Sequence, residues 1–254
     1  MSGIPAVVSI GTLDPWNAAG LGLDIRALAE CGVRPLSVAA GFSAQDERGV
    51  HAQFALPPEA IAAQFAALAS APVAAYRIGA LLDAAGVAAV ARALAGVRVP
   101  VVYDPVFAPS AGGSFADDAT VAAVRERLLP RVTIVTPNLA EAARLLGSAR
   151  PAERSEMLAT ARALQRLGPS AVLLTGGHLP GRPLDVLAGA AGSAEFEAER
   201  IAGEMRGTGC LLAAALAAAL AHGRSLRVAV EEARAFVRTK LRAAQTFGPQ
   251  RVAY

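Results

Sequence analysis

A run of small residues, Arg206-Gly207-Thr208-Gly209-Cys210, is followed at once by a stretch of leucine and alanine. Glycine lets the backbone approach a ligand closely, and the first N–H groups of a helix have no partner within the helix. Such a turn binds phosphate or a developing negative charge, because the positive end of the helix dipole lies behind it. Gly207, Thr208 and Gly209 are therefore candidate catalytic residues. Cys210, in the first helical turn, is expected to have a lowered pKa and to act as a base.

The alternative for this segment is an ordinary strand-to-helix turn, with Cys210 as a small buried apolar residue. Polar residues elsewhere in the chain weigh against it. They follow short apolar runs, and in open α/β sheets ligands bind beyond the carboxyl ends of the strands. These residues are Gly11, Asp14, Gly20 and Asp24; Ser43 and Gln45; Gly79; Asp104; Asn138 and Glu141; Thr175, Gly177 and His178.

Asn138 and Glu141 are three residues apart at the start of a helical segment and share one face of it. With Asp104 they form a set of oxygen ligands suited to a hard cation. The alternative is a helix N-cap followed by an acid that the helix dipole favours, with Asp104 as a turn residue before proline.

The elements that must position these residues alternate along the chain. Short apolar runs predict strands buried on both faces, and amphipathic segments between them predict helices. This alternation indicates an α/β fold with a mostly parallel sheet and helices on both of its faces. The segment 45–56 is expected to form a flap at one sheet edge. The predicted strands are 6–10, 36–40, 74–78, 99–103, 132–135 and 171–174; the predicted helices are 18–31, 58–69, 84–95, 117–128, 139–146, 152–167, 208–221 and 226–244.

Composition excludes several classes of protein. The 254 residues are 54% hydrophobic and are expected to form one domain, residues 1–254. The longest apolar run is too short to span a bilayer, and no leader pattern is present, so we expect a cytoplasmic protein without a membrane partner. Two distant cysteines imply neither a disulfide scaffold nor a zinc site. Arginines scattered among acids argue against nucleic-acid binding.

The ordered motifs resemble the thiamin-pathway hydroxymethylpyrimidine/phosphomethylpyrimidine kinases of the ribokinase-like superfamily, over nearly the whole chain. The resemblance implies one ribokinase-like, Rossmann-like three-layer α/β/α domain. It also implies ATP-dependent phosphorylation of a hydroxymethyl group and then of the resulting monophosphate, a magnesium ion (Mg²⁺), an aminopyrimidine substrate and a possible homodimer. The matching pieces are Ala19-Gly20 with Asp24; Ala44-Gln45; Asp104-Pro105-Val106; Thr136-Pro137-Asn138 with Glu141; Gly176-Gly177-His178-Leu179; Asp185-Val186-Leu187; and Gly207-Thr208-Gly209-Cys210.

The resemblance also implies a role for each residue. Cys210 occupies the position of the superfamily's aspartate base, in the turn that holds the transferring phosphoryl group. Asp104 and Glu141 would hold magnesium, and Asn138, Thr175 and Gly177 would contact the nucleotide. Gln45 would read the pyrimidine edge, and Asp24 would contact its hydroxymethyl or amino group. A solvated loop glutamine and a surface helix acid are the alternatives. Gly11, Gly20, Ala80 and Phe107 complete the substrate set, whereas His178 is expected to close a turn.

Departures from the family pattern leave other functions open. The first loop is one residue longer and carries Trp16; Ala80 and Phe107 replace methionines; Thr175 replaces a lysine; and the lysine expected after Asp104-Pro105-Val106 is absent. A pyridoxal or pyridoxine kinase of the same fold is one alternative. A non-catalytic pyrimidine-binding or regulatory module is the other.

Overall fold

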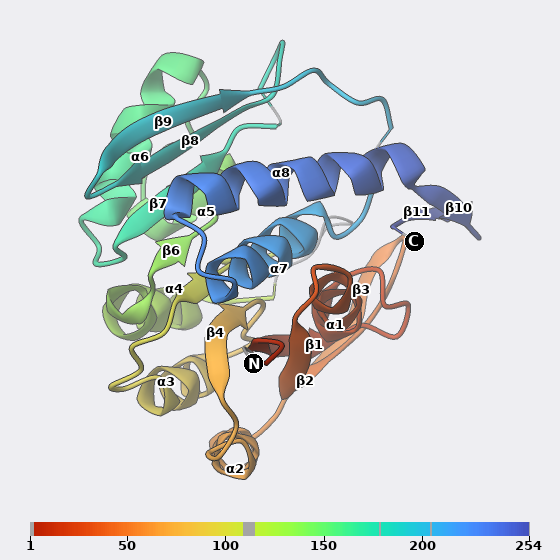
Figure 1. Ribbon diagram of the computed structural model, residues 1–254, viewed down its shortest axis with the longest axis vertical. Coiled ribbons are helices and arrows are strands. Elements are labelled where there is room, and N and C mark those ends of the chain that lie inside the picture. Colours follow the sequence, from red (N-terminus) through yellow and green to blue (C-terminus); the bar gives the residue numbers. More distant parts are fainter. Residues whose placement is uncertain (1–2, 109–114, 178, 204, 254) are drawn as a thin grey trace.

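A nine-stranded sheet forms the centre of the computed structural model, which describes residues 3–108, 115–177, 179–203 and 205–253 (Figure 1). Its strand order is β3-β2-β1-β4-β5-β6-β7-β8-β9. Six strands are parallel, and β3, β8 and β9 add antiparallel edges. The parallel strands are β1 (Ala6–Leu13), β2 (Arg34–Asp46), β4 (Val73–Ile78), β5 (Val101–Tyr103), β6 (Ile134–Val135) and β7 (Ala171–Thr175); the others are β3 (Gly49–Ala55), β8 (Leu184–Gly189) and β9 (Gly192–Glu197).

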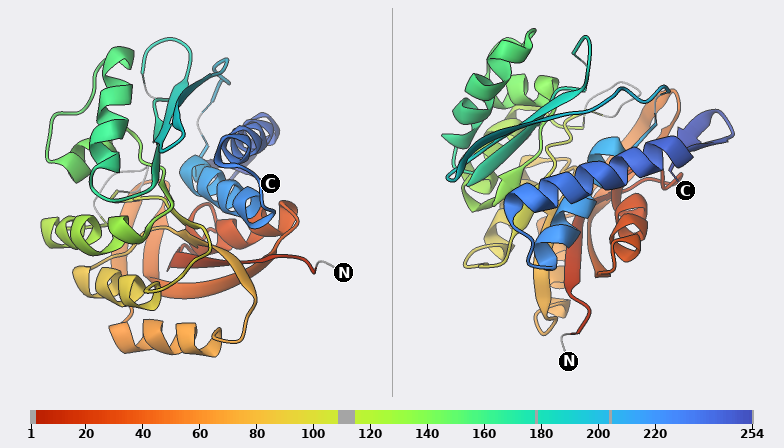
Figure 2. Two further views of the ribbon diagram at one scale, coloured as in Figure 1. Left: turned by 60° about the vertical axis from the view of Figure 1, so that its left-hand side comes forward. Right: turned by 45° about the horizontal axis from the view of Figure 1, so that its top comes forward.

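Helices cover both faces of the sheet and make three layers (Figure 2). One face carries α1 (Gly20–Glu30), α7 (Thr208–Ala221) and α8 (Leu226–Ala243). The other face carries α2 (Pro58–Ala67), α3 (Ala84–Ala93), α4 (Asp118–Ala123), α5 (Leu139–Leu146) and α6 (Met157–Gln165), with the short turns η1 (Val124–Leu128), η2 (Leu129–Arg131) and η3 (Arg154–Glu156). A separate hairpin of β10 (Gln245–Phe247) and β11 (Gln250–Val252) follows α8.

Side-chain alternation in the strands explains the two cores. Successive residues of a strand point to opposite faces, so Val8 packs under α2 and α3, whereas Val7 packs under α1 and α7. Helix α7 is apolar all round because it lies between the sheet and α8, and ten of its residues are buried.

The predicted α/β fold with a mostly parallel sheet is confirmed, including all six predicted strands and all eight predicted helical segments. The segment predicted as a flap is the end of β2 paired with β3 at the sheet edge. The prediction missed β8, β9 and the β10–β11 hairpin; β9 and β10 have exposed residues that give only weak apolar patterns, whereas β8 is largely buried. No helix among the described residues combines the length and apolar character needed to cross a membrane.

Candidate active site

The turn at residues 207–210, which we call the anion-binding turn, begins α7 beside the carboxyl ends of the sheet strands. Gly207 has a φ of +78°, a left-handed conformation that favours glycine. A Cβ atom there would lie 2.3 Å from Cδ2 of Leu23 and 2.4 Å from the carbonyl oxygen of Ala18. A Cβ at Gly209 would lie 3.6 Å from both carboxylate oxygens of Asp104. The turn is therefore packed tightly against the loop after β1 and faces the end of β5.

Cys210 is buried at the base of this turn, with 8% of its surface exposed. Its sulfur accepts a hydrogen bond from the N–H of Gly20, and Arg77 lies beside it. Burial nevertheless raises the pKa of the Cys210 thiol to about 12, because desolvation of a thiolate outweighs the attraction of Arg77. The predicted lowering of this pKa is wrong: a helix N-terminus stabilises a thiolate only when the thiolate keeps enough of its solvation.

A buried arginine that the sequence analysis missed lies below the turn. Arg77, in β4, is 1% exposed; its Nη1 lies 2.9 Å from Oδ2 of Asp24, and its Nη2 lies 3.0 Å from Oδ2 of Asp104. Gly79 leaves room for the guanidinium, since a Cβ there would lie 2.0 Å from Nη1. The available signal was one charged residue, followed two positions later by glycine, in an otherwise uncharged buried strand.

Asp24, predicted to contact the substrate, has no exposed surface. Its Oδ2 accepts a hydrogen bond of 2.7 Å from the Ser9 hydroxyl and pairs with Arg77. Burial raises the pKa of Asp24, while Arg77 and Ser9 oppose that rise. The alternative of a surface helix acid is wrong, because the side chain is fully buried. In this structure Asp24 balances the charge of Arg77, and its contact with a substrate stays a prediction.

Asp104 and Glu141 are the two carboxylates predicted to hold a metal; Asp104 is buried and Glu141 is half-buried. Burial raises the pKa of Asp104 to about 6, although Arg77 opposes the rise. Burial also raises the pKa of Glu141 well above its usual value, and the nearby charge of Asp104 adds to that rise. Two neighbouring carboxylates that disfavour each other's ionisation form a site whose charge a divalent cation would balance. Among the described residues, no three His, Cys, Asp or Glu side chains cluster as metal ligands.

The capping alternative for Asn138 and Glu141 is confirmed at the start of α5. The side-chain oxygen of Asn138 accepts from the N–H groups of Ala140 and Glu141, and the Glu141 carboxylate accepts from the N–H of Asn138 at 2.8 Å. This capping box fixes Glu141 next to Asp104 and does not exclude a metal role for its other oxygen.

The residues predicted to contact the nucleotide lie at the ends of β6 and β7. These are one and two strands beyond β5, which Asp104 follows. Asn138 forms a parallel bridge with Thr175, whose N–H donates to the Pro137 carbonyl at 2.9 Å. Gly177 is exposed, and its carbonyl accepts a hydrogen bond from Arg200. These three residues are therefore brought together beside the metal candidates. His178 lies outside the described residues.

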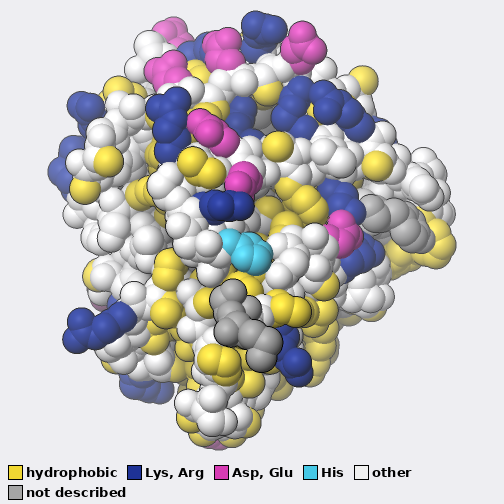
Figure 3. Space-filling view, in the orientation of Figure 1, with side chains coloured by type: hydrophobic (Ala, Val, Ile, Leu, Met, Phe, Trp, Pro, Cys, Tyr) yellow, Lys and Arg dark blue, Asp and Glu magenta, His cyan; other side chains and the backbone are white. Residues whose placement is uncertain are grey.

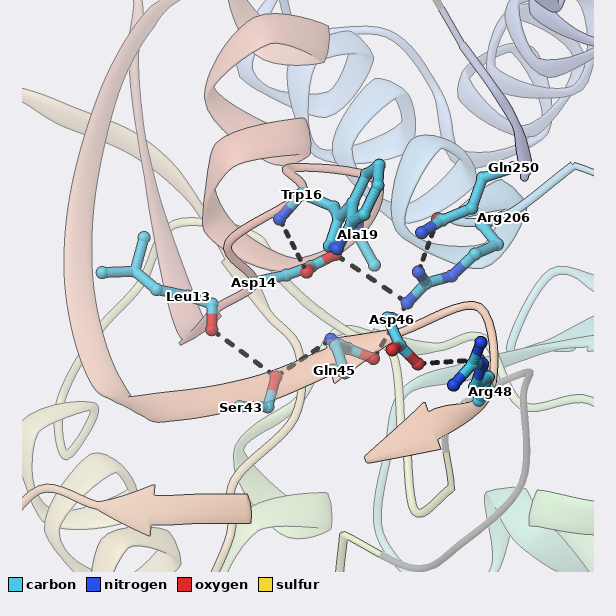
Figure 4. Close-up of polar contacts among 10 residues, drawn as sticks. All are labelled: Leu13, Asp14, Trp16, Ala19, Ser43, Gln45, Asp46, Arg48, Arg206 and Gln250. Carbon is cyan, nitrogen blue, oxygen red and sulfur yellow. Dashed lines mark hydrogen bonds and ion pairs between the residues drawn. The ribbon is translucent and has the colours of Figure 1, made fainter. Parts of the chain in front are cut away.

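On the opposite side of the anion-binding turn, Gln45 lies at the end of β2 and is 6% exposed. Its Nε2 donates to the Ser43 hydroxyl at 2.9 Å, and its Oε1 accepts from Nη2 of Arg206 at 2.9 Å (Figure 4). Arg206 also donates to Oε1 of Gln250 at 2.7 Å and lies 3.9 Å from Asp14. The alternative of a solvated loop glutamine is therefore wrong, and the partners of Gln45 were not foreseen.

The remaining predicted substrate residues occupy different environments. A Cβ at Gly11 would lie 3.9 Å from Arg77, and Gly20, with a φ of +61°, is packed against the carbonyl of Thr12. Ala80 is buried in a small apolar cluster with Leu82 and Phe115. Phe107 is 3% exposed and packs in the core beneath Arg144. The place of Phe107 in a substrate pocket stays a prediction.

Figure 3 shows how charged side chains are distributed over one face of the protein. Basic side chains there lie in separate groups, with acidic and uncharged side chains between them, and form no continuous stripe. The expected absence of a nucleic-acid partner stays a prediction.

Comparisons with known proteins show what this chain is similar to in sequence and in structure. A sequence profile described as phosphomethylpyrimidine kinase matches residues 14–253. The hydroxymethylpyrimidine/phosphomethylpyrimidine kinase of Streptomyces coelicolor is 36% identical over 235 residues, which are 92% of this chain and 87% of that protein. The crystal structure of phosphomethylpyrimidine kinase from Clostridium difficile has a TM-score of 0.82 and 25% identity, and covers 92% of this chain and 98% of its own. An ADP complex of Bacillus subtilis pyridoxal kinase has a TM-score of 0.91 and 25% identity, with coverage of 99% and 97%.

Proposed function

The chain belongs to the phosphomethylpyrimidine kinase family, and we propose that it transfers the γ-phosphate of ATP to the hydroxymethyl group of hydroxymethylpyrimidine and then to the resulting monophosphate. This activity would supply the pyrimidine half in thiamin biosynthesis, as the names of its relatives indicate. The whole chain, residues 1–254, would act as one domain. The protein is a kinase, so the non-catalytic module is the least supported alternative.

One observation carries the proposal: the anion-binding turn faces the buried carboxylate of Asp104, at 3.6 Å from the Cβ position of Gly209. Phosphoryl transfer depends on positioning and on stabilising charge around the transferring group. Unpaired N–H groups at the start of α7 would donate to phosphoryl oxygens on one side. The carboxylates of Asp104 and Glu141 would hold a cation on the other.

The donor set fits magnesium, which is usually bound by one or two carboxylates together with phosphate oxygens and water. Asp104 and Glu141 would hold it, and it would neutralise charge on the phosphates when bound. Arg77 would keep Asp104 oriented through the contact at 3.0 Å. Asn138, Thr175 and Gly177 would contact the nucleotide at the neighbouring strand ends.

The acceptor hydroxyl would lie against Cys210, between the anion-binding turn and the N–H of Gly20. Because the pKa of Cys210 is raised to about 12, the residue holds its proton at neutral pH. We therefore propose that Cys210 contacts the acceptor as a neutral thiol. The hydroxyl proton would pass to an oxygen of the transferred phosphoryl group, and the N–H groups of the turn would stabilise the charge that develops during transfer. A metal held by Asp104 and Glu141 would supply further neutralisation of the phosphate charge when bound.

A substrate panel with Mg·ATP tests the proposed function. Hydroxymethylpyrimidine and its monophosphate should both be phosphorylated, and Gln45→Leu should lower affinity for hydroxymethylpyrimidine by roughly 5-fold to 100-fold, because polar groups of the ring lose a partner. Calorimetry on Gln53→Leu, an exposed β3 residue, is the control. Turnover of pyridoxal alone would overturn the proposal in favour of the vitamin B6 kinase suggested by the similarity to the B. subtilis structure.

A further inference from the structure

We propose that Arg206 is a positioning residue: it fixes the orientation of the Gln45 amide and ties it to the C-terminal hairpin β10–β11. This inference rests on the proposed function, in which Gln45 reads the edge of an aminopyrimidine. Arg206 comes directly before the anion-binding turn, so the same segment that receives the phosphoryl group also reaches the ring-reading residue.

The chemistry of arginine decides which way the Gln45 amide faces. A guanidinium only donates hydrogen bonds, so the atom at 2.9 Å from its Nη2 must be the amide oxygen of Gln45. The amide nitrogen then faces the Ser43 hydroxyl at 2.9 Å, and that hydroxyl donates in turn to the carbonyl of Leu13. The donors and acceptors in this chain of hydrogen bonds are therefore fixed by Arg206 at one end and by the Leu13 carbonyl at the other (Figure 4).

An amide held in this way still offers a ligand one hydrogen-bond donor and one hydrogen-bond acceptor. The oxygen has a second lone pair, and the nitrogen has a second N–H. Together they match the adjacent donor and acceptor of an aminopyrimidine. If the amide turned over, its N–H₂ group would face the guanidinium, and both the pairing with Arg206 and the match to the ring would be lost.

The other end of the guanidinium is anchored by the C-terminal hairpin. Arg206 Nη1 donates to Oε1 of Gln250 at 2.7 Å, and Gln250 is 3% exposed, with no hydrogen-bond partner for its Nε2 among the described residues. The contact with Arg206 therefore sets this amide too. The hairpin is held at the site because Phe247 packs edge-on against Trp16, with ring centroids 6.2 Å apart. Trp16 belongs to the unusually long first loop, whose Asp14 lies 3.9 Å from Arg206.

A double-mutant cycle tests this role. Arg206→Met keeps the length of the side chain but removes its donors, and it should raise the KM for hydroxymethylpyrimidine roughly 10-fold, with kcat and the KM for ATP changed by less than about twofold. The double variant Arg206→Met/Gln45→Leu should be no worse than Gln45→Leu alone, within about twofold, because Arg206 acts through Gln45. For an analogue in which hydrogen replaces the amino group of the ring, the loss of affinity from wild type to Arg206→Met should be much smaller than for hydroxymethylpyrimidine.

Further variants keep the test decisive if Arg206→Met folds poorly. Gln250→Leu leaves the arginine in place but removes its anchor, and should raise the same KM by a smaller factor, about 3-fold. Arg206→Lys keeps the charge near Asp14 but cannot form the planar fork between two amides, so it should give an intermediate loss. Arg224→Ala is the matched control, because it removes an arginine from an exposed ion pair beyond the C-terminal end of α7.

The outcomes separate this inference from the proposed function. Additive losses in the double variant would show that Arg206 contacts the substrate itself and would overturn the positioning role. Full affinity in Arg206→Met or Arg206→Lys, with a loss in Gln45→Leu, would overturn it while leaving Gln45 as the ring reader. Full affinity in Gln45→Leu would instead overturn the ring-reading part of the proposed function, and the positioning role with it.

Discussion

Arg77 and Asp24 form an ion pair of 2.9 Å in which 1% and 0% of the two side chains are exposed. The guanidinium also contacts Asp104, so two carboxylates share one buried cation beneath the anion-binding turn. Each carboxylate would be costly to bury alone, because an unpaired charge loses its hydration without compensation. The cluster joins β4, α1 and the end of β5 at the point where the phosphoryl group is expected.

Replacing Arg77 should therefore destabilise the protein strongly. Arg77→Met leaves Asp24 and Asp104 buried without a cation, and we expect the free energy of unfolding to fall by about 3–5 kcal/mol. Urea unfolding followed by circular dichroism measures this change. Arg92→Met, an exposed arginine in the last turn of α3, should change it by less than about 0.5 kcal/mol. Equal unfolding curves for the two variants would contradict the paired role of Arg77.

Asp24→Asn separates charge compensation from substrate binding. The variant keeps the shape of the side chain but weakens its bond with Arg77, so we expect unfolding free energy to fall by about 1–3 kcal/mol. The KM for hydroxymethylpyrimidine should stay within about twofold, since the side chain has no exposed surface. Kinetics and thermal melting on the same preparation decide the matter. A raised KM with an unchanged melting temperature would place Asp24 in the substrate site.

Glu141→Gln tests the metal assignment. Glutamine can still accept the hydrogen bond from the N–H of Asn138, so the cap of α5 should survive. Loss of the charge should lower kcat at least 10-fold and raise the magnesium concentration needed for half-maximal rate, with little effect on affinity for the pyrimidine. Magnesium titrations of the initial rate give both quantities. Glu59→Gln, in the first turn of α2, is the control; matching titrations would remove Glu141 from the metal site.

Two glycines with the same backbone angle provide a matched test of the anion-binding turn. Gly207 and Gly96 have φ values of +78° and +80°, but of the two only Gly207 is crowded; no atom of the part of the chain that the structure describes lies within 4 Å of the Cβ position of Gly96. Gly96→Ala should cost about 1–2 kcal/mol of unfolding free energy from the left-handed conformation alone. Gly207→Ala should cost more and should also impair turnover, because its Cβ would push α7 away from Ala18 and Leu23. Equal costs would contradict this account of the packing.

The two thiols should react slowly with iodoacetamide, and Cys31 should react before Cys210. Burial raises the pKa of Cys31 to about 11 and that of Cys210 to about 12. Below these values the thiolate fraction, and hence the rate, should rise roughly tenfold for each unit of pH. Timed mass spectrometry between pH 7 and pH 10 measures both sites, and urea-unfolded protein, where the two should react alike, is the control. Faster modification of Cys210 in the folded protein would indicate a lowered pKa.

Local sequence patterns were sufficient to predict the α/β fold and the positions of the main strands and helices. A strand buried on both faces must be apolar throughout, and a helix on a sheet must be amphipathic, so local patterns carry that information. Sequence patterns also indicated the turn at residues 207–210 and, as the alternative to a metal role, a helix N-cap at Asn138 followed by a dipole-favoured acid at Glu141. These features depend on a few neighbouring residues.

Which charged groups meet, and in which direction their pKa values shift, depends on how distant segments pack in three dimensions. Arg206 and Gln45 are 161 residues apart, and Arg77 and Asp104 are 27 apart, so no local pattern records their pairing. The same holds for Cys210: its place at a helix start favours a thiolate, but packing between α1, the sheet and α7 removes the water that would stabilise one. Desolvation depends on everything that surrounds a group in space, and for that reason burial reversed the pKa direction that the sequence predicted.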